Sequence, residues 1–423
     1  MKKTLLPFAL VAAALSLLSC APAPPTNTAA NANANANANA NASPAPTEAA
    51  AKKAPTDLEQ LAGRLVTQSA GVKEGDVVLV TGGSQDQELL EDVAVNVRKA
   101  GAFPLVSINS DRMAKRMYTD VPDKYDTQMD QWGMKVADAA NVTIVIESNL
   151  AEGLFADADP KRMAARAKAN EPINDEFIKR NVRQVSIGNG LYPTEWRAKH
   201  YGMTLDELSK SFWDGVNIDY ASLQSRGEQV KGVLAAGNEL HITNPNGTDL
   251  KVKVQGRPVF VSDGVISPED VQKGGPAVSV YLPAGEVYCA PVAGTAEGKV
   301  VHTLDYYQGK EVDNLTLTIA GGKVTEMNGS GPGFEQLKAD YDAAGEGRDI
   351  FSFVDLGINP NVKLPASSKL GNWVPAGSIT VGIGNNTWAG GDDKTAYGYT
   401  IFLPGSTVTL DDKAIIENGQ LKI

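Results

Sequence analysis

The stretch VVLVTGG, residues 77–83, decides the fold of the first half of this chain. It is a short continuous apolar run that ends in two glycines, which indicates a buried strand followed by a turn. Residues 89–97 then place apolar side chains at helical spacing, and Gly101 closes the predicted helix. A second apolar run, FPLVSIN at 103–109, follows directly. A strand, a helix and a strand in this order predict a parallel sheet flanked by helices.

The same pattern extends to both sides of this unit. Apolar residues recur at helical spacing over 58–66, and two further predicted strands are NVTIVIES at 141–148 and RQVSIGN at 183–189. Thr204 and Glu207 form a capping-box pattern at the start of a later helix. No G-x-G-x-x-G surrounds the two glycines at 82 and 83, so the pattern does not favour a nucleotide site. We therefore predict an α/β domain over residues 56–235.

The second region, residues 236–423, has a different pattern. Alternating apolar and polar residues, as in NELHITNPNGTDLKVKV at 238–254, are joined by Asn-Gly and Gly-Gly turns. One helix is predicted at GFEQLKADYDAA, residues 333–344. The predicted fold class is thus α/β, with an N-terminal parallel-sheet α/β domain and a C-terminal strand-rich mixed α/β domain.

The first 55 residues have the pattern of an export signal and a tether. Two lysines precede an apolar run that ends in Leu-Ser-Cys at residues 18–20, which resembles the bacterial lipoprotein cleavage box. Residues 1–20 are therefore predicted to be a lipoprotein signal peptide, with Cys20 carrying the lipid. The Asn-Ala repeat within 21–55 has almost nothing to bury, so it predicts a disordered tether. The expected location is the cell envelope, and Ala21 favours the outer membrane because it gives no retention signal of the aspartate type.

Composition limits the classes of partner. A formal charge of −11 and a pI near 5.0 argue against nucleic acid. If Cys20 is lipidated, Cys289 is the remaining cysteine, and its strand-forming neighbours indicate a buried core residue.

Several separated segments resemble one known family, the thermophilic metallo-aminopeptidases of the aminopeptidase T and leucyl aminopeptidase kind. The resemblance runs from about Asp57 to the C-terminus. The segments that carry it are LYPTEWRAKHYGMTLDEL (191–208), NPNGTDLKVKV (244–254), YLPAGEVYCAPVAGTAEGKVV (281–301), VDLGINPN (354–361) and LDDKAIIENGQL (410–421).

The resemblance implies a two-metal site that removes N-terminal residues from peptides, in a homodimer whose sites face an enclosed cavity. Two divalent ions, zinc, cobalt or manganese, would lower the pKa of a bridging water there. Carried over by position, Glu286 falls on the first metal-binding glutamate of the family. Asp355 falls on the second glutamate and is one methylene shorter.

The imidazole ligands that the resemblance implies are replaced. Thr380, in TVGIG at 380–384, stands where the family has histidine, and Gly398 and Thr400 occupy the place of its H-x-D segment. A threonine hydroxyl is a poor ligand beside imidazole, and glycine supplies none. The ligands carried over therefore reduce to two carboxylates.

The three histidines and two adjacent aspartates are the candidates for replacement ligands. If the strands around Glu286 and His302 pair as a hairpin across AGTAEG (293–298), His302 shares the face of Glu286, whereas a slip of one residue removes it. His200 is predicted to lie at the surface, and His241 on a polar strand face. Adjacent carboxylates at 392 and 393 are typical of a solvated turn.

Three hypotheses follow from these patterns. The first is an active metal-dependent aminopeptidase on the outer face of a membrane. The second is a degenerate relative that keeps the fold and cavity but binds peptides or another ligand without hydrolysis, with a metal ion bound weakly or none, and the ligand count favours it. The third is a structural envelope lipoprotein.

Overall fold

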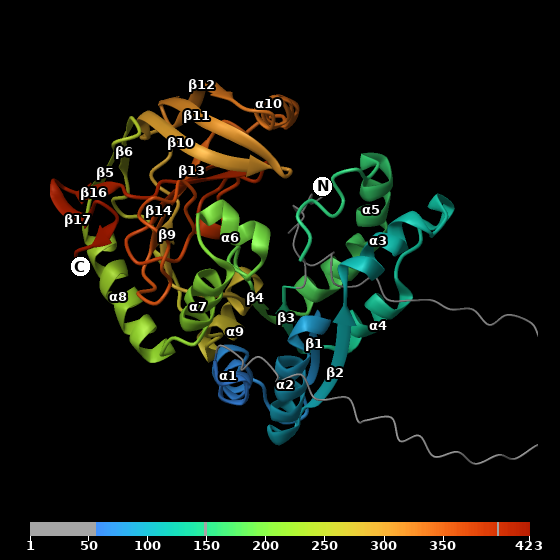
Figure 1. The fold of residues 1–423 in the computed structure, drawn as a ribbon. Helices are drawn as coiled ribbons and strands as arrows, with labels where there is room; N and C mark the ends of the chain where they lie inside the picture. Colours follow the sequence, from blue (N-terminus) through green and yellow to red (C-terminus); the bar gives the residue numbers. More distant parts are fainter. Residues whose placement is uncertain (1–55, 148–149, 396) are drawn as a thin grey trace, which may run out of the picture.

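The computed structural model describes residues 56–147, 150–395 and 397–423 (Figure 1). The predicted signal peptide with Cys20 and the predicted tether, residues 21–55, lie outside the described residues. Within the described ranges, no helix is long and apolar enough to cross a membrane.

The first sheet is parallel throughout, as the strand-helix-strand pattern predicts. Its strands, in spatial order, are β2 (Phe103–Asn109), β1 (Val77–Gly83), β3 (Val142–Ile146), β4 (Arg183–Ile187) and β8 (Ser279–Leu282). Strand β8 comes from beyond residue 236, so the chain returns to the first sheet after it has begun the second region.

Helices cover both faces of this sheet because its central strands are continuous apolar runs, so that apolar side chains point to both faces. Val78 and Val80 of β1 belong to the main core with Leu61 and Leu90, whereas Leu79 packs with Val136 on the opposite face. The helices of this region are α1 (Leu58–Arg64), the π-helical turn η1 (Leu65–Ser69), α2 (Gln87–Lys99), α3 (Asp111–Thr119), α4 (Gln131–Ala139) and α5 (Pro160–Lys179), with short 3-10 turns η2 (Ser84–Asp86) and η3 (Asp123–Tyr125).

Three helices lead from the first sheet to the second region. They are α6 (Glu195–Tyr201), α7 (Leu205–Val216) and α8 (Tyr220–Ala236). The predicted capping box is present at the start of α7, since Thr204 and Glu207 bond reciprocally. Helix α8 contacts β7 and β9, and so places the first region against the sheet that holds the candidate site.

The second sheet is antiparallel and closes one end of the molecule. Figure 1 shows its β10–β12 part at the top of the view, beside helix α10 (Phe334–Ala343), which matches the predicted helix at 333–344. In spatial order its strands are β12 (Lys323–Ser330), β11 (Lys310–Ala320), β10 (Glu297–Tyr307), β6 (Thr248–Lys253), β5 (Glu239–Asn244), β16 (Thr407–Leu410), β17 (Lys413–Glu417) and β18 (Gln420–Leu421).

The third sheet, called the site sheet below, is antiparallel and has five strands. One of its faces is apolar: Val354, Val381 and Ile401 join the main core. Its strands in spatial order are β15 (Gly398–Phe402), β14 (Ile379–Gly384), β13 (Phe351–Gly357), β9 (Glu286–Cys289) and β7 (Phe260–Ser262). The remaining short elements are α9 (Pro268–Lys273), η4 (Gly275–Val278) and η5 (Thr387–Ala389).

The predicted hairpin between the Glu286 strand and the His302 strand is wrong. Strand β9 pairs with β7 and β13 in the site sheet, whereas β10 pairs with β6 and β11 in the second sheet. The segment between them carries the chain from one sheet to the other. Gly298 allows this, because a Cβ at that position would collide with the Asp249 carbonyl of β6.

Candidate functional site

The face of the site sheet that points away from the main core, called its free face below, carries the residues that the sequence predicts for the site. Asp355 lies opposite Thr380 on one side and Tyr288 on the other, and Glu286 lies opposite Gly357. Directly opposed residues point to the same face of a sheet, and residues two apart on one strand share it as well. Glu286, Asp355 and Thr380 therefore lie on one face of three neighbouring strands.

The positions on β15 are less uniform. Thr400 lies opposite Gly382 on this face, whereas Gly398 lies at the exposed start of the strand, where a Cβ would meet no atom within 4 Å. The β15 residue opposite Thr380 is Phe402. An aromatic ring, and neither Gly398 nor Thr400, is thus the β15 neighbour of Thr380.

The centre of this face contains unpaired acceptors. Asp355 is 1% exposed and Thr380 is 0% exposed, so both are buried in the sheet. Within the part of the chain that the structure describes, neither Asp355 Oδ1 nor Thr380 Oγ1 has a hydrogen-bond partner. Such groups are costly when buried without a partner, so the geometry indicates a place for a water molecule, a proton or a ligand.

Glu286 is held by the first region of the chain. Asn189 Nδ2 donates to Glu286 Oε1 at 3.1 Å and to the Pro283 carbonyl at 2.9 Å. Asn189 follows β4 at the carboxyl end of the parallel sheet and has a positive φ of 41°, which asparagine tolerates better than most residues. Its own carbonyl accepts from Asn372 Nδ2 at 3.1 Å. Asn189 therefore joins the parallel sheet to the site.

The prediction from sequence missed Asn189. The signal available was an asparagine between two glycines, GNG at 188–190, directly after a buried parallel strand. Loops at the carboxyl ends of such strands commonly hold functional side chains.

Burial shifts the pKa values of both carboxyl groups upward. Burial raises the pKa of Glu286 to about 7, and the hydrogen bond from Asn189 opposes that rise. Burial also raises the pKa of Asp355 well above its usual range, and the negative charge of Glu286 adds to the effect. At neutral pH the two groups together therefore carry less than their full negative charge.

A continuous chain of aromatic rings lies on the same face. Its members are in contact from one edge of the sheet to the other, with ring centroids 4.8–5.6 Å apart. In order they are Phe260, Tyr288, Trp388, Phe353, Trp373 and Phe402. All except Phe353 remain partly exposed, so this aromatic chain is accessible to a ligand in a way that a closed core is not.

Gly382 explains how Phe353 fits into the aromatic chain. A Cβ at position 382 would lie within 2.8 Å of Phe353 Cδ1, so the ring lies directly over the glycine. A glycine in the stretch TVGIG thus makes room for an aromatic side chain beside Asp355. The sequence does not show which side chain this glycine accommodates.

His302 lies on β10, outside the site sheet. It is 1% exposed, neither ring nitrogen has a partner among the described residues, and burial lowers the pKa of its imidazole. Its ring centroid is 6.3 Å from that of Phe402, at the end of the aromatic chain. The hairpin that would have placed it opposite Glu286 is absent, so its proposed role as replacement ligand has lost its geometric basis.

The other two histidines take part in local contacts. His200 was predicted to lie at the surface, but its side chain is only 13% exposed, stacks on Tyr306 with centroids 3.7 Å apart and approaches Glu152. His241 lies on a polar strand face, as predicted, with Nε2 2.7 Å from Asp249 Oδ1.

The carboxylates after β14 close a turn. Asp393 exchanges hydrogen bonds with Asn386, and Asp392 is exposed to solvent. Cys289 is 1% exposed, and burial raises the pKa of its thiol to about 12, which fits the core role expected for it.

These donors do not fit the two-metal site that the resemblance implies. Over the described ranges, no group of three or more histidine, cysteine, aspartate or glutamate side chains is placed to hold a metal ion. The site sheet offers two carboxylates and one hydroxyl on this face, and its five strands contain no histidine. Zinc, cobalt and manganese sites of this kind need more oxygen and nitrogen ligands.

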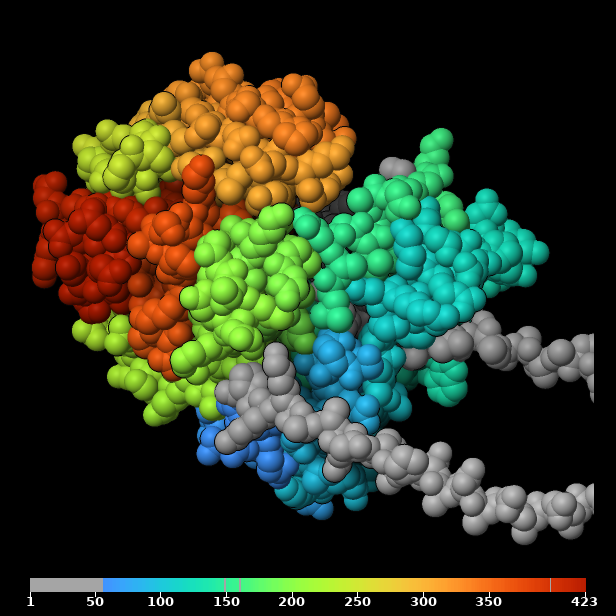
Figure 2. All heavy atoms as spheres, in the orientation of Figure 1, coloured from blue at the N-terminus to red at the C-terminus, as the bar shows by residue number. Residues whose placement is uncertain are grey.

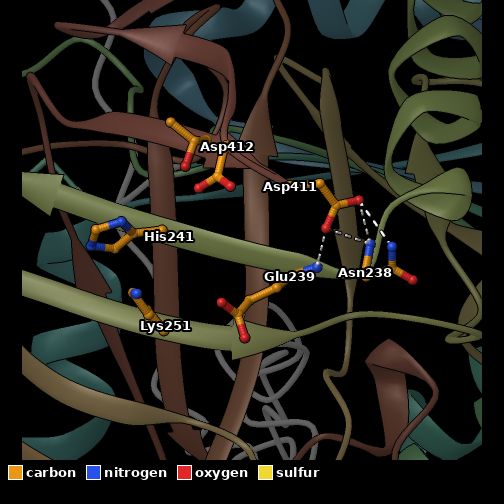
Figure 3. Close-up of a pocket in the computed structure, with 7 residues that line it drawn as sticks. Asn238, Glu239, His241, Lys251, Asp411 and Asp412 are labelled. Carbon is orange, nitrogen blue, oxygen red and sulfur yellow. Dashed lines mark hydrogen bonds between the residues drawn. The ribbon is translucent and has the colours of Figure 1, made fainter.

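A surface pocket of about 330 Å³ lies elsewhere, on β5, β6 and β16 of the second sheet (Figure 3). Asp411, one of its lining residues, accepts hydrogen bonds from the backbone N–H groups of Asn238 and Glu239. That carboxylate is therefore engaged in closing a turn. The pocket shares no residue with the site sheet, and we assign no function to it.

Comparison with known proteins gives a family and a fold. The sequence model of the thermophilic metalloprotease family, M29, matches residues 54–340. Wild-type AmpT from Thermus thermophilus has a similar structure, with a TM-score of 0.63 and 17% identity over 86% of this chain and 99% of that chain. The 2,5-dihydroxypyridine dioxygenase from Pseudomonas putida KT2440 has a TM-score of 0.53 and 16% identity, over 87% of this chain and 97% of that chain. No match was found among curated proteins.

Proposed function

Because this chain belongs to the thermophilic metalloprotease family, M29, we propose that it is an aminopeptidase-like protein of the cell envelope whose metal site is degraded. It recognises the amino-terminal end of peptides and hydrolyses them slowly or not at all. The observation that carries this proposal is the free face of the site sheet, where Glu286 and Asp355 lie beside Thr380 and an aromatic chain.

The degraded site is supported by what replaces the missing ligands. Thr380 is the β14 neighbour of Asp355 and Phe402 is the β15 neighbour of Thr380, and neither supplies an imidazole. A water molecule is activated for peptide hydrolysis by metal ions that lower its pKa. With two carboxylates as the inherited donors, we expect weak and incomplete binding of zinc, cobalt or manganese.

The position in the envelope is supported by the sequence of the first 55 residues. Lipid on Cys20 would hold the protein at a membrane, with the outer membrane favoured, and residues 21–55 would let the folded part move on a tether. The proposed partners are peptides, and nucleic acid is disfavoured by the charge of −11. A homodimer is proposed from the resemblance alone.

A test of the proposal combines metal analysis with an activity assay. The purified mature protein is analysed for bound metals and assayed on a leucyl chromogenic substrate, with zinc, cobalt or manganese added. We expect well under one metal ion per chain and turnover close to background. Two metal ions per chain, together with activity that Glu286→Gln abolishes, would overturn the degraded-site proposal.

A purely non-catalytic ligand-binding role is the second candidate. The partly exposed aromatic rings beside unpaired acceptors favour it, because they offer a binding surface that does not depend on metal. Measurable hydrolysis that rises with added metal and falls in Asp355→Asn would exclude it.

A further inference from the structure

The free face of the site sheet has three acceptor groups on neighbouring strands. Asp355 and Thr380 are directly opposed, and Glu286 lies diagonally from Asp355 on the next strand. Opposed residues of antiparallel strands place their Cβ atoms about 5 Å apart, and diagonal neighbours about 7 Å apart. Asp355 is therefore the neighbour of both other groups, with Thr380 on one side of it and Glu286 on the other.

Two of these acceptors have no partner of their own. Asp355 Oδ1 and Thr380 Oγ1 are unpaired among the described residues, and both side chains are more than nine-tenths buried. The third is already positioned, since Asn189 holds Glu286 Oε1 from the loop after β4. This arrangement leaves unused acceptor capacity at Asp355 and Thr380, beside the positioned Glu286.

Among the residues that the structure describes, no lysine, arginine or histidine influences the pKa of Glu286 or Asp355. The five strands of the site sheet contain no lysine, arginine or histidine. The guanidinium of the nearby Arg257 donates to the backbone carbonyls of Ala290 and Gly390 instead. A ligand that carries a positive charge would therefore complement Glu286 and Asp355 and stabilise their ionised forms.

The aromatic chain defines what kind of cation fits. Tyr288 and Phe353 lie on the same strands and the same face as Glu286 and Asp355, and Trp388 contacts both rings. Aromatic faces attract organic cations and bury hydrocarbon, whereas they offer nothing to a hydrated metal ion. A primary ammonium group has three N–H donors for the three acceptors, and its substituent can pack on the rings.

We propose that this face binds the primary ammonium group of an amino-terminal residue with a large apolar side chain, and that it does so without a metal ion. The proposal deepens the proposed function and rests on it for the class of ligand. The ammonium donates to Glu286, Asp355 and Thr380, and the side chain lies against Tyr288 and Trp388.

The test uses protein freed of metal by a chelator, and compares phenylalanine amide with N-acetylphenylalanine amide. Binding is followed by calorimetry and by the fluorescence of Trp373 and Trp388. We expect phenylalanine amide to bind, and the acetylated compound to bind at least about ten-fold more weakly, because it lacks the charged donor. Equal affinity for the two compounds, or no binding of either to the chelated protein, would overturn the proposal.

Variants locate the site on the protein. Asp355→Asn and Glu286→Gln should each weaken binding of phenylalanine amide by about ten-fold or more, whereas Asp392→Asn, at the exposed turn, should not change it. Trp388→Phe should reduce the fluorescence response. Circular dichroism confirms folding of each variant, and the wild-type comparison of the two ligands stands if a variant fails to fold. Equal loss in Asp392→Asn would overturn the assignment of the site.

The result of the binding test can be distinguished from the result of the test of the proposed function. Metal content and hydrolysis decide whether the metal site is degraded, and both are measured without chelator. Binding of phenylalanine amide that appears only when zinc, cobalt or manganese is restored would overturn the metal-free ammonium site alone. Two bound metals with activity would overturn the degraded-site proposal, while the chelated binding experiment would still report on the ammonium.

Discussion

At the scale of single residues, Thr380 has a hydroxyl group that the fold buries completely without a partner in the described part of the chain. Replacing that hydroxyl by a methyl group of similar size removes an unsatisfied polar atom. We predict that Thr380→Val, measured in chelator, raises the free energy of unfolding by about 1–2 kcal/mol. Chemical denaturation followed by circular dichroism measures the change.

Thr248 supplies the matched control. It is 3% exposed, but its Oγ1 accepts from the Val301 backbone N–H at 2.9 Å. Thr248→Val should therefore lower the free energy of unfolding by about 1–2 kcal/mol, since it leaves that N–H unpaired. If both valine variants change stability in the same direction, the assignment of Thr380 as an unpaired hydroxyl is wrong.

Asp86 gives a prediction about pH. Both its carboxylate oxygens accept from Tyr192 Oη at 2.8 Å, yet burial dominates and raises the pKa of Asp86 from 3.8 to about 6. A raised folded-state pKa means that the folded protein loses stability as pH rises from about 4 to about 6. The size of the shift corresponds to about 3 kcal/mol.

Asp86→Asn removes this dependence, because an amide of the same shape does not ionise. Relative to the wild type, we predict that the variant gains up to about 3 kcal/mol in free energy of unfolding between pH 3.5 and pH 7.5. Urea denaturation at a series of pH values measures the difference between the two proteins, in which the other carboxylates cancel. A difference that stays constant with pH would contradict the prediction.

At the scale of elements, strand β13 depends on a glycine at its end. A Cβ on Gly357 would lie 2.5 Å from the Trp373 carbonyl oxygen, and closer still to Ser378 Oγ and the Pro375 carbonyl. Backbone atoms cannot yield cheaply, so Gly357→Ala should cost about 1–3 kcal/mol and displace the 373–378 segment from the site sheet. Thermal denaturation and the fluorescence of Trp373 report both effects.

Gly398 is the matched control on the same sheet. A Cβ there meets no atom within 4 Å, and the residue has no positive φ. Gly398→Ala should therefore leave stability unchanged or raise it slightly, by less than about 1 kcal/mol. A cost equal to that of Gly357→Ala would show that glycine matters in these strands for a reason other than close approach.

Sequence predicted the elements whose signals are local. Strands β1 and β2, helix α2 and the capping box at Thr204 follow from periodicity and from residues three or four apart, and the structure has them where predicted. The hairpin that included His302 was wrong because strand pairing is decided by contacts between distant segments. In this case Gly298 lets β10 approach β6 closely, and β10 pairs with β6 in the second sheet.

The candidate site was predictable only in part for the same reason. The resemblance to the family identified Glu286, Asp355 and Thr380. That they share one face depends on the pairing register of β9, β13 and β14, which the sequence alone does not give. Asn189 reaches Glu286 from a different sheet, across 97 positions of the chain. The aromatic chain likewise combines residues from β7, β9, β13, β15, the 3-10 turn η5 and one loop, so no single segment reveals it.

At the scale of the whole molecule, the site depends on contact between the two regions. The first sheet receives β8 from beyond residue 236, and the chain passes from that strand directly into Glu286 at the start of β9. Asn189 from the loop after β4 then bonds Glu286, and helix α8 packs on β7 and β9. In Figure 2, atoms of both regions form one continuous surface around helices α6 and α7.

The sequence of the first 55 residues makes a prediction for the intact protein in cells. Cys20 is one of two cysteines in the chain, and the other, Cys289, is buried in the site sheet. If Cys20 carries the lipid, Cys20→Ala should move the protein from the membrane fraction to the soluble fraction of the envelope, and remove the incorporation of labelled fatty acid. A diacyl anchor supplies far more membrane affinity than any polar contact of the folded part, so the shift should be nearly complete.

Cys289→Ala is the control that separates anchoring from folding. Removal of a buried thiol should lower the free energy of unfolding by about 1 kcal/mol, yet leave the protein in the membrane fraction with its label. Detergent should release the wild type and Cys289→Ala alike, because it disperses the bilayer into which the proposed lipid on Cys20 inserts. If Cys20→Ala stays in the membrane fraction after a salt wash, another part of the chain binds the membrane. The proposed lipid on Cys20 would then not account for the membrane location of the folded part.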